Sequence, residues 1–117
     1  MNNRTVSDLD TNHNVRKILV RHQIDLGWLS HYACRGTVYI QGELLLLPGV
    51  SSALTPLTVA NLFDEIGGAV GVCNMIIELR NWHHDSFNSD WQPVPEVVSL
   101  RRANGVNPRA NAFEGGG

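Results

Sequence analysis

Helical spacing of apolar residues is the first pattern along the chain, and it follows a polar N-terminal segment. Val15, Ile18 and Leu19 lie three and four residues apart, so they share one face of a helix. Asn12 is of a residue type that caps helix N-termini, and Gly27 can adopt the left-handed conformation that ends a helix. We therefore predict a frayed segment over residues 1–12 and a helix from residue 13 to residues 25–27.

Strict alternation replaces helical spacing over residues 29–44. The alternation is interrupted by Arg35-Gly36, and two alternating runs around a glycine-bearing turn are typical of a β-hairpin. Gly42, inside the second strand, indicates a bulge or the close approach of a helix backbone. The residues predicted to face the core are Leu29, His31, Ala33, Val38, Ile40 and Leu44.

A second helix and a third strand follow. Thr55 before Pro56 fits an N-cap followed by proline at the first helical position. The apolar face of this helix consists of Val59, Leu62, Phe63 and Ile66. The stretch "VCNMIIELRNW" is the predicted last strand, with Cys73, Met75, Ile77 and Leu79 on one face.

These patterns predict an α+β fold of order α-β-β-α-β. Two helices pack on one face of a small three-stranded mixed sheet. The predicted domain covers residues 13–82. Residues 83–117 are rich in polar residues, proline and glycine, so we expect a mostly irregular tail with one docked segment at about residues 91–100.

A run of four leucines, residues 44–47, ends the second predicted strand before Pro48-Gly49. Successive strand residues point to opposite faces, so the strand accounts for Leu44 only. We expect Leu45, Leu46 and Leu47 to leave the sheet and to cover the edge of the core or contact a partner.

Composition narrows the function classes. The 117 residues include 9 Lys+Arg and 11 Asp+Glu, and this net charge of -2 argues against a nucleic-acid partner. No apolar run approaches the roughly 18–20 residues of a transmembrane segment. The N-terminus lacks the apolar region of a signal peptide, so we expect a cytoplasmic protein, or a periplasmic one if the chain is a processed fragment.

The strand "GTVYIQGEL" at residues 36–44, the Gly71-Val72 pair and the strand "CNMIIEL" together carry a family resemblance. Over residues 13–82 the chain resembles the BON domain, a module named for bacterial osmotically induced and nodulation proteins. The resemblance implies a non-enzymatic module that contacts phospholipid surfaces or protein partners, without catalytic residues or cofactors. The loop over residues 45–56 and the tail depart from the family pattern.

Candidate chemistry outside the resemblance rests on histidine and cysteine. His83, His84 and Asp85 are potential metal ligands, but adjacent side chains on an extended segment point apart. A metal-dependent enzyme at these residues ranks behind the binding module. Cys34 and Cys73 form either one bridge or, as we favour, free buried thiols. His31 and Cys34 should point to opposite faces of a strand, which prevents a catalytic pair.

The sheet face opposite the helices is the predicted binding face. Tyr32, Tyr39, Ile76 and Trp82 should lie on it. Two predictions remain open for this face. It is either covered, by the tail or by a second subunit in a homo-oligomer, or it contacts a ligand, a lipid or a docking protein.

Overall fold

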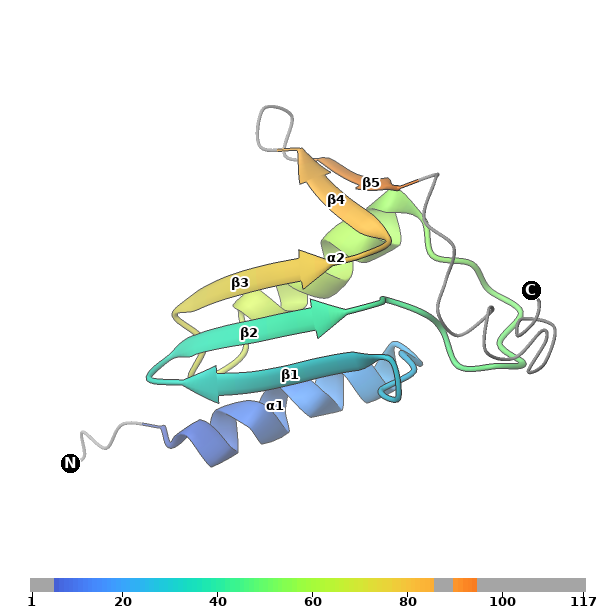
Figure 1. Ribbon diagram of the computed structural model, residues 1–117. Coiled ribbons are helices and arrows are strands. Elements are labelled where there is room, and N and C mark those ends of the chain that lie inside the picture. Colours follow the sequence, from blue (N-terminus) through green and yellow to red (C-terminus); the bar gives the residue numbers. More distant parts are fainter. Residues whose placement is uncertain (1–5, 86–89, 95–117) are drawn as a thin grey trace, which may run out of the picture.

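The computed structural model describes residues 6–85 and 90–94. Two helices and a three-stranded mixed sheet follow one another in the order α-β-β-α-β, and a two-stranded hairpin comes after them (Figure 1). The predicted α+β class is therefore confirmed. The elements are α1 (Asp8–Arg21), β1 (Leu29–Cys34), β2 (Thr37–Gly42), α2 (Pro56–Gly67), β3 (Asn74–Leu79), β4 (Trp82–Asp85) and β5 (Asp90–Pro93).

β2 is the central strand of the sheet. It pairs antiparallel with β1 and parallel with β3. Arg35 and Gly36 join β1 to β2 with φ values of 54° and 85°. Positive φ at both central residues is the type I′ turn, whose twist matches that of the strands it joins. This two-residue turn sets the register, which pairs Cys34 with Thr37 and Tyr32 with Tyr39.

α1 begins and ends earlier than predicted. Ser7 is its N-cap, and the Ser7 hydroxyl oxygen accepts a hydrogen bond of 3.1 Å from the backbone N–H of Asp10. The prediction of Asn12 as the cap was therefore wrong, and residues 8–12 are helical rather than frayed. His22 is the C-cap, and Gln23 takes the left-handed conformation with φ 63°. The predicted end at Gly27 was also wrong.

α2 agrees with its prediction. Thr55 is the N-cap and Pro56 the first helical residue. The hydroxyl of Thr55 accepts from the backbone N–H of Thr58 at 3.2 Å, and the hydroxyl of Thr58 accepts from the backbone N–H of Thr55 at 2.7 Å. This reciprocal capping box satisfies two backbone donors that would otherwise lack partners at the start of the helix.

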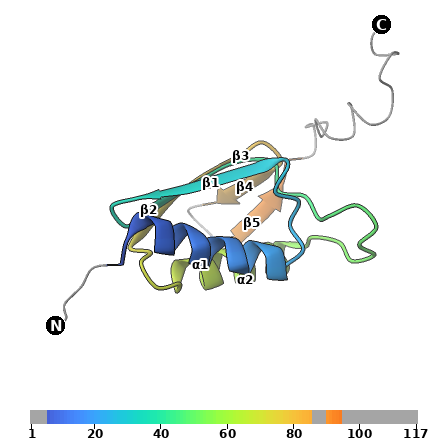
Figure 2. The same ribbon diagram turned by 90° about the horizontal axis from the view of Figure 1, so that it is seen from below.

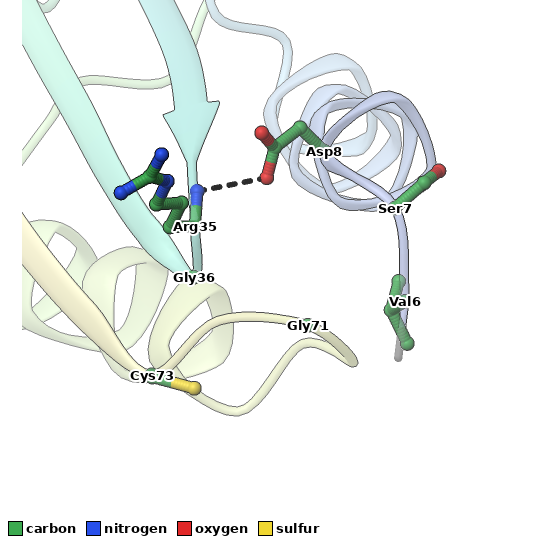
Figure 3. Close-up of a pocket in the computed structure, with 7 residues that line it drawn as sticks. All are labelled: Val6, Ser7, Asp8, Arg35, Gly36, Gly71 and Cys73. Carbon is green, nitrogen blue, oxygen red and sulfur yellow. Dashed lines mark hydrogen bonds between the residues drawn. The ribbon is translucent and has the colours of Figure 1, made fainter. Parts of the chain in front are cut away.

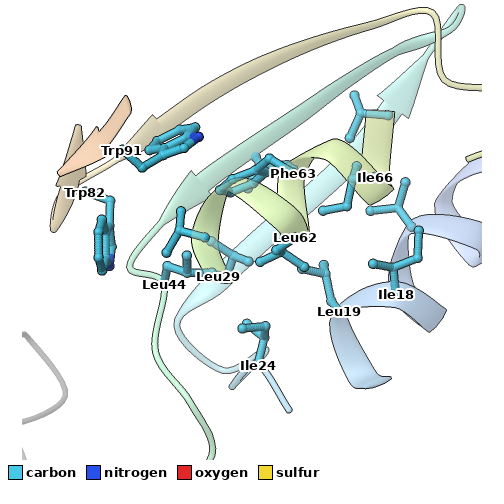
Figure 4. Close-up of a cluster of buried hydrophobic side chains, with 14 of the residues drawn as sticks. Ile18, Leu19, Ile24, Leu29, Leu44, Leu62, Phe63, Ile66, Trp82 and Trp91 are labelled. Atoms are coloured by element: carbon cyan, nitrogen blue, oxygen red, sulfur yellow. The ribbon is translucent and has the colours of Figure 1, made fainter. Parts of the chain in front are cut away.

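Both helices lie against one face of the sheet, as Figure 2 shows. The core between the two layers is formed by side chains from both helices and all three strands. Figure 4 shows part of it. Its fully buried members include Val15 and Leu19 of α1, Val38 and Ile40 of β2, and Ile66 of α2.

Gly42 is a point of close backbone approach. Its φ is 120°, and a Cβ at this position would overlap the carbonyl oxygen of Trp28. The close contact comes from the segment before β1, so the alternative of a helix backbone was wrong. The same segment makes further backbone contact beyond β2. Asp25 donates its N–H to Leu45 at 2.8 Å, and Leu47 donates to Gln23 at 2.8 Å.

The run of leucines therefore leaves the sheet to pair with residues 23–25. Ile24 and Leu46 form an isolated antiparallel bridge. Leu46 packs against the core, whereas the side chain of Leu47 is 44% exposed. The expectation that these leucines cover the core edge holds for Leu46.

β4 and β5 form a hairpin, so residues 83–85 and 90–93 are strands within the tail that was predicted to be mostly irregular, and Trp91 lies in its predicted docked segment. Asn81 separates β3 from β4. Its side-chain amide donates to the carbonyl of Leu44 at 2.9 Å and accepts from the N–H of Leu44 at 3.0 Å. Beyond this point Trp82 and Trp91 enter the core. The ring of Trp91 stacks on Phe63 with centroids 4.9 Å apart. The remainder of the predicted docked segment, residues 95–100, lies outside the described residues.

Candidate functional site

The outer face of the three-stranded sheet carries a row of apolar side chains. Tyr32 of β1 pairs with Tyr39 of β2, which pairs with Ile76 of β3. The side chain of Tyr32 is 50% exposed and that of Ile76 is 40% exposed. The two tyrosine rings stack with centroids 4.8 Å apart and an interplanar angle of 15°. The structure thus brings together three of the four residues predicted for the binding face.

Mostly uncharged side chains surround this row. Alternation along each strand directs the following residues outward together with the row: Ser30, Cys34, Thr37, Gln41, Asn74 and Glu78. Glu78 is the charged residue among them. Depletion of charge around exposed aromatic residues is the compositional mark of the centre of a protein interface.

Trp82 does not belong to the outer face, and this prediction was wrong. It is 7% exposed and belongs to the core cluster. The prediction assumed that β3 continues through residue 82. Instead the strand ends at Leu79, and Trp82 opens β4 with its side chain turned to the core.

His31 lies on the inner side of β1, next to α1. Its ring is half-buried, and its Nδ1 atom is buried without a hydrogen-bond partner among the described residues. Burial lowers the pKa of His31, and the positive charge of Arg16 lowers it further. Cys34 is exposed on the opposite side of the strand, so the predicted separation of His31 from Cys34 is confirmed.

Both cysteines are free, and both are exposed, so their predicted burial was wrong. Cys73 lines a cleft of about 550 Å³ at the end of the sheet where α1 begins. Figure 3 shows the cleft between the start of α1, the β1–β2 turn and the segment before β3. Asp8 ties two of these parts together, because its Oδ1 accepts from the backbone N–H of Arg35 at 2.9 Å.

Two glycines contribute backbone to the walls of this cleft. Gly36 and Gly71 both have positive φ, and a Cβ on Gly71 would overlap the hydroxyl of Thr11. The charged groups at the rim, Asp8 and Arg35, are of opposite sign. Sequence patterning did not indicate this cleft, because three segments far apart in the chain create it.

His83, His84 and Asp85 lie in succession on β4. The ring of His84 packs against Trp91, with centroids 4.9 Å apart. Within residues 6–85 and 90–94, no three histidine, cysteine, aspartate or glutamate side chains are grouped closely enough to hold a metal ion. Alternation along β4 directs adjacent side chains of this run to opposite faces.

A polar network joins the two helices on the other side of the molecule. Glu65 of α2 forms an ion pair with Arg21, and its Oε1 lies 2.8 Å from Nε2 of His22. Partial burial and the charge of Arg21 lower the pKa of His22. These side chains hold the end of α1 against α2, which is a structural role.

Glu43 is a buried carboxylate that sequence reasoning missed. Its side chain is 1% exposed, and its Oε2 lies 3.6 Å from Nη1 of Arg80. It directly follows Gly42, the last residue of β2. Alternation in the sequence gave no sign of this burial, because it places residue 43 on the side away from the core.

Compared with known proteins, the chain matches no protein-family model, no curated protein and no solved structure. The resemblance to BON domains accordingly stays a prediction. Among the described residues, no helix combines the length and the apolar character that a membrane span requires.

Proposed function

We propose that the protein is a non-enzymatic interaction module that binds a protein partner through the outer face of its sheet. The observation that carries this proposal is the exposed row Tyr32, Tyr39 and Ile76 in the middle of that face. Aromatic side chains are enriched at the centres of protein interfaces, where they bury a large area at a small entropic cost. The resemblance to BON domains also supports a role without catalysis.

The charge of the outer face favours a protein partner over a nucleic acid or an anionic headgroup. Glu78 is its charged outward residue, and no outward residue of β1, β2 or β3 is basic. A surface without cations gains nothing from releasing the counterions of a phosphate backbone. It also gains nothing from the negative potential of a membrane leaflet.

A second candidate, contact with a phospholipid surface, is supported by a different part of the molecule. Arg16 and Lys17 are exposed on α1, and Val20 and Leu9 beside them are 54% and 74% exposed. Basic and apolar side chains together on an exposed helix are suited to an anionic lipid interface. We propose this contact as an alternative mode of the same module.

Site-specific photo-crosslinking in cells that express the protein tests the protein-binding proposal. A photoreactive residue replaces Tyr39 on the outer face. A control chain carries it at Gln92, which is exposed on β5. We expect adducts of defined mass from position 39 and none from position 92, and we expect Tyr32→Ser with Ile76→Ser to abolish them. Equal yields at both positions, or adducts insensitive to the two substitutions, would contradict the proposal.

Co-sedimentation with vesicles tests the lipid alternative. Vesicles of phosphatidylcholine are compared with vesicles that also contain phosphatidylserine, at low salt. The alternative predicts binding to the second kind alone and its loss in Arg16→Glu/Lys17→Glu. If the wild-type chain does not sediment with either kind, the lipid contact is refuted and the protein-binding proposal is unaffected.

A further inference from the structure

We infer that the outer sheet face binds a second copy of this chain, face to face, about a two-fold axis parallel to β2. This inference rests on the proposed function and names its partner. A symmetric dimer requires a surface that is complementary to itself, so that each residue meets an acceptable neighbour when the surface is rotated onto itself. The strand register shows which residues lie side by side across the sheet, and therefore which residues meet when the face is rotated onto itself.

An axis parallel to β2 keeps every residue at its height along the strands and exchanges β1 with β3. The central row reads Tyr32, Tyr39 and Ile76 across the sheet. After the rotation, Tyr39 faces Tyr39 of the second copy, and Tyr32 faces Ile76. Each apolar side chain of this row therefore meets another apolar side chain of the row, which removes apolar area from water.

The two flanking rows are also compatible with this axis. One row consists of Ser30, Gln41 and Glu78, and the other of Cys34, Thr37 and Asn74. Glu78 then faces the hydroxyl of Ser30 of the second copy, which can donate to its carboxylate when it gives up its 3.5 Å hydrogen bond to the carbonyl of Gln41. Like charges do not face each other in either row, so no electrostatic repulsion opposes the pairing.

The size of the face sets the strength of the dimer. Each strand has six residues, and three strands give a flat footprint on the order of 300 Å² per copy. A standard stable interface buries about 800 Å² per partner. A dimer through this face alone should therefore be weak, and its formation should depend on protein concentration.

Sedimentation velocity over about 5–500 µM protein tests the inference on the full chain. We expect monomer at the low end and dimer at the high end. Tyr39→Arg should abolish the dimer, because the axis would place two guanidinium groups against each other. Gln92→Arg adds the same charge on β5, away from the face, and should leave the dimer unchanged. A dimer that survives Tyr39→Arg would overturn the inference.

Disulfide trapping tests the direction of the axis. In a Cys73→Ser background, Asn74→Cys should form a covalent dimer with the native Cys34, which lies opposite position 74 of the second copy. Within one chain the two positions are separated by β2, about 10 Å, which is too far to bridge. An axis perpendicular to the strands would instead place Cys34 opposite position 30. Trapping through Ser30→Cys in place of Asn74→Cys would overturn the proposed axis.

A monomer at all concentrations would refute a second copy as the partner. The reactivity of a thiol placed at position 39 then tests whether the proposed function still holds. In a chain with Cys34→Ser and Cys73→Ser, the thiol of Tyr39→Cys is labelled at low concentration. If the thiol of this monomer reacts fast, the face is open and the protein-binding proposal stands with a different partner. If it is protected, the chain itself covers the face, and both proposals fail.

Discussion

Gly42 shows how a single residue joins two parts of this fold. Its left-handed backbone lets β2 pass directly against the carbonyl of Trp28, and Glu43 beyond it is buried. A side chain at position 42 would have to displace backbone atoms, because the obstructing group is a carbonyl rather than the end of a flexible side chain. The position therefore requires glycine for two separate reasons, conformation and space.

A comparison of Gly42→Ala with Gly49→Ala separates the effect of conformation from the effect of space. Gly49 also has a positive φ, of 91°, but a Cβ added there would meet no heavy atom within 4 Å. We expect Gly49→Ala to lower the free energy of unfolding by about 1 kcal/mol, the cost of the left-handed conformation. Gly42→Ala adds the overlap with Trp28 and should cost about 3 kcal/mol or more. Urea denaturation measures both. Equal losses would show that the overlap relaxes freely.

His31 makes the stability of the protein depend on pH. Burial and Arg16 lower its pKa below the ordinary value of 6.5, so the folded state disfavours the protonated ring. The unfolded chain binds the proton more readily than the folded protein. The free energy of unfolding is therefore highest above pH 6.5 and decreases as the pH drops from 6.5 toward the pKa of His31 in the folded state. The lowered pKa of His22 contributes with the same sign.

Replacement of His31 by glutamine tests this dependence. The midpoint of urea denaturation is measured between about pH 7.5 and about pH 5.5, a range that brackets the ordinary histidine pKa. We expect the wild-type midpoint to fall on acidification and the His31→Gln midpoint to fall less, with the remainder due to His22. A wild-type midpoint that rises over this range would contradict the assigned direction.

Among the elements, the hairpin and α2 were predictable from sequence because local chemistry determines them. Arg35-Gly36 dictates a two-residue turn, and Thr55-Pro56 dictates a helix start. The end of α1 was not predictable in this way. Gln23, which is not a glycine, takes the left-handed conformation there, and its carbonyl pairs with Leu47 far along the chain. Tertiary contact thus overrides the local signal of Gly27.

The same limit explains the error at Trp82. Local alternation continues the last strand through residue 82, and nothing in the neighbouring sequence reveals that the side chain of Asn81 pairs with the backbone of Leu44. That pairing joins residues 37 positions apart. It ends β3 and lets the following hairpin place Trp91 against Phe63. For the candidate site, Tyr32, Tyr39 and Ile76 followed from alternation alone, because they lie within regular strands.

The segment Leu45 to Leu47 gives a prediction at the scale of an element. Leu46 packs against the core opposite Ile24, whereas Leu47 is 44% exposed. We expect Leu46→Ser to lower the free energy of unfolding by about 2 kcal/mol. Leu47→Ser, the matched control one residue on, should change it by less than about 0.5 kcal/mol. Denaturation at a few µM protein measures both, and a larger loss for Leu47→Ser would mean that the exposed leucine is covered in solution.

At the scale of the whole molecule, the elements formed by residues 6–85 and 90–94 cover one side of the sheet. α1 and α2 lie on the inner face, and β4–β5 closes one end of the core through Trp82 and Trp91 (Figures 2 and 4). A small domain buries a modest share of its apolar surface, so the inner layer has to supply the stability of the fold. The apolar row on the outer face is, in our proposal, reserved for a partner instead.

Ile76 and Ile77 offer the most direct test of that claim, because they are identical residues next to each other on β3 that face opposite sides of the sheet. Serine at either position loses the same β-propensity, worth up to about 1 kcal/mol, so the difference between the two variants measures packing. The measurement is the free energy of unfolding of Ile76→Ser and Ile77→Ser at a few µM protein. We predict a loss below about 1 kcal/mol for Ile76→Ser and about 2 kcal/mol more for Ile77→Ser. Equal losses would show that the outer face is part of the folding core, and would contradict its role as a binding surface.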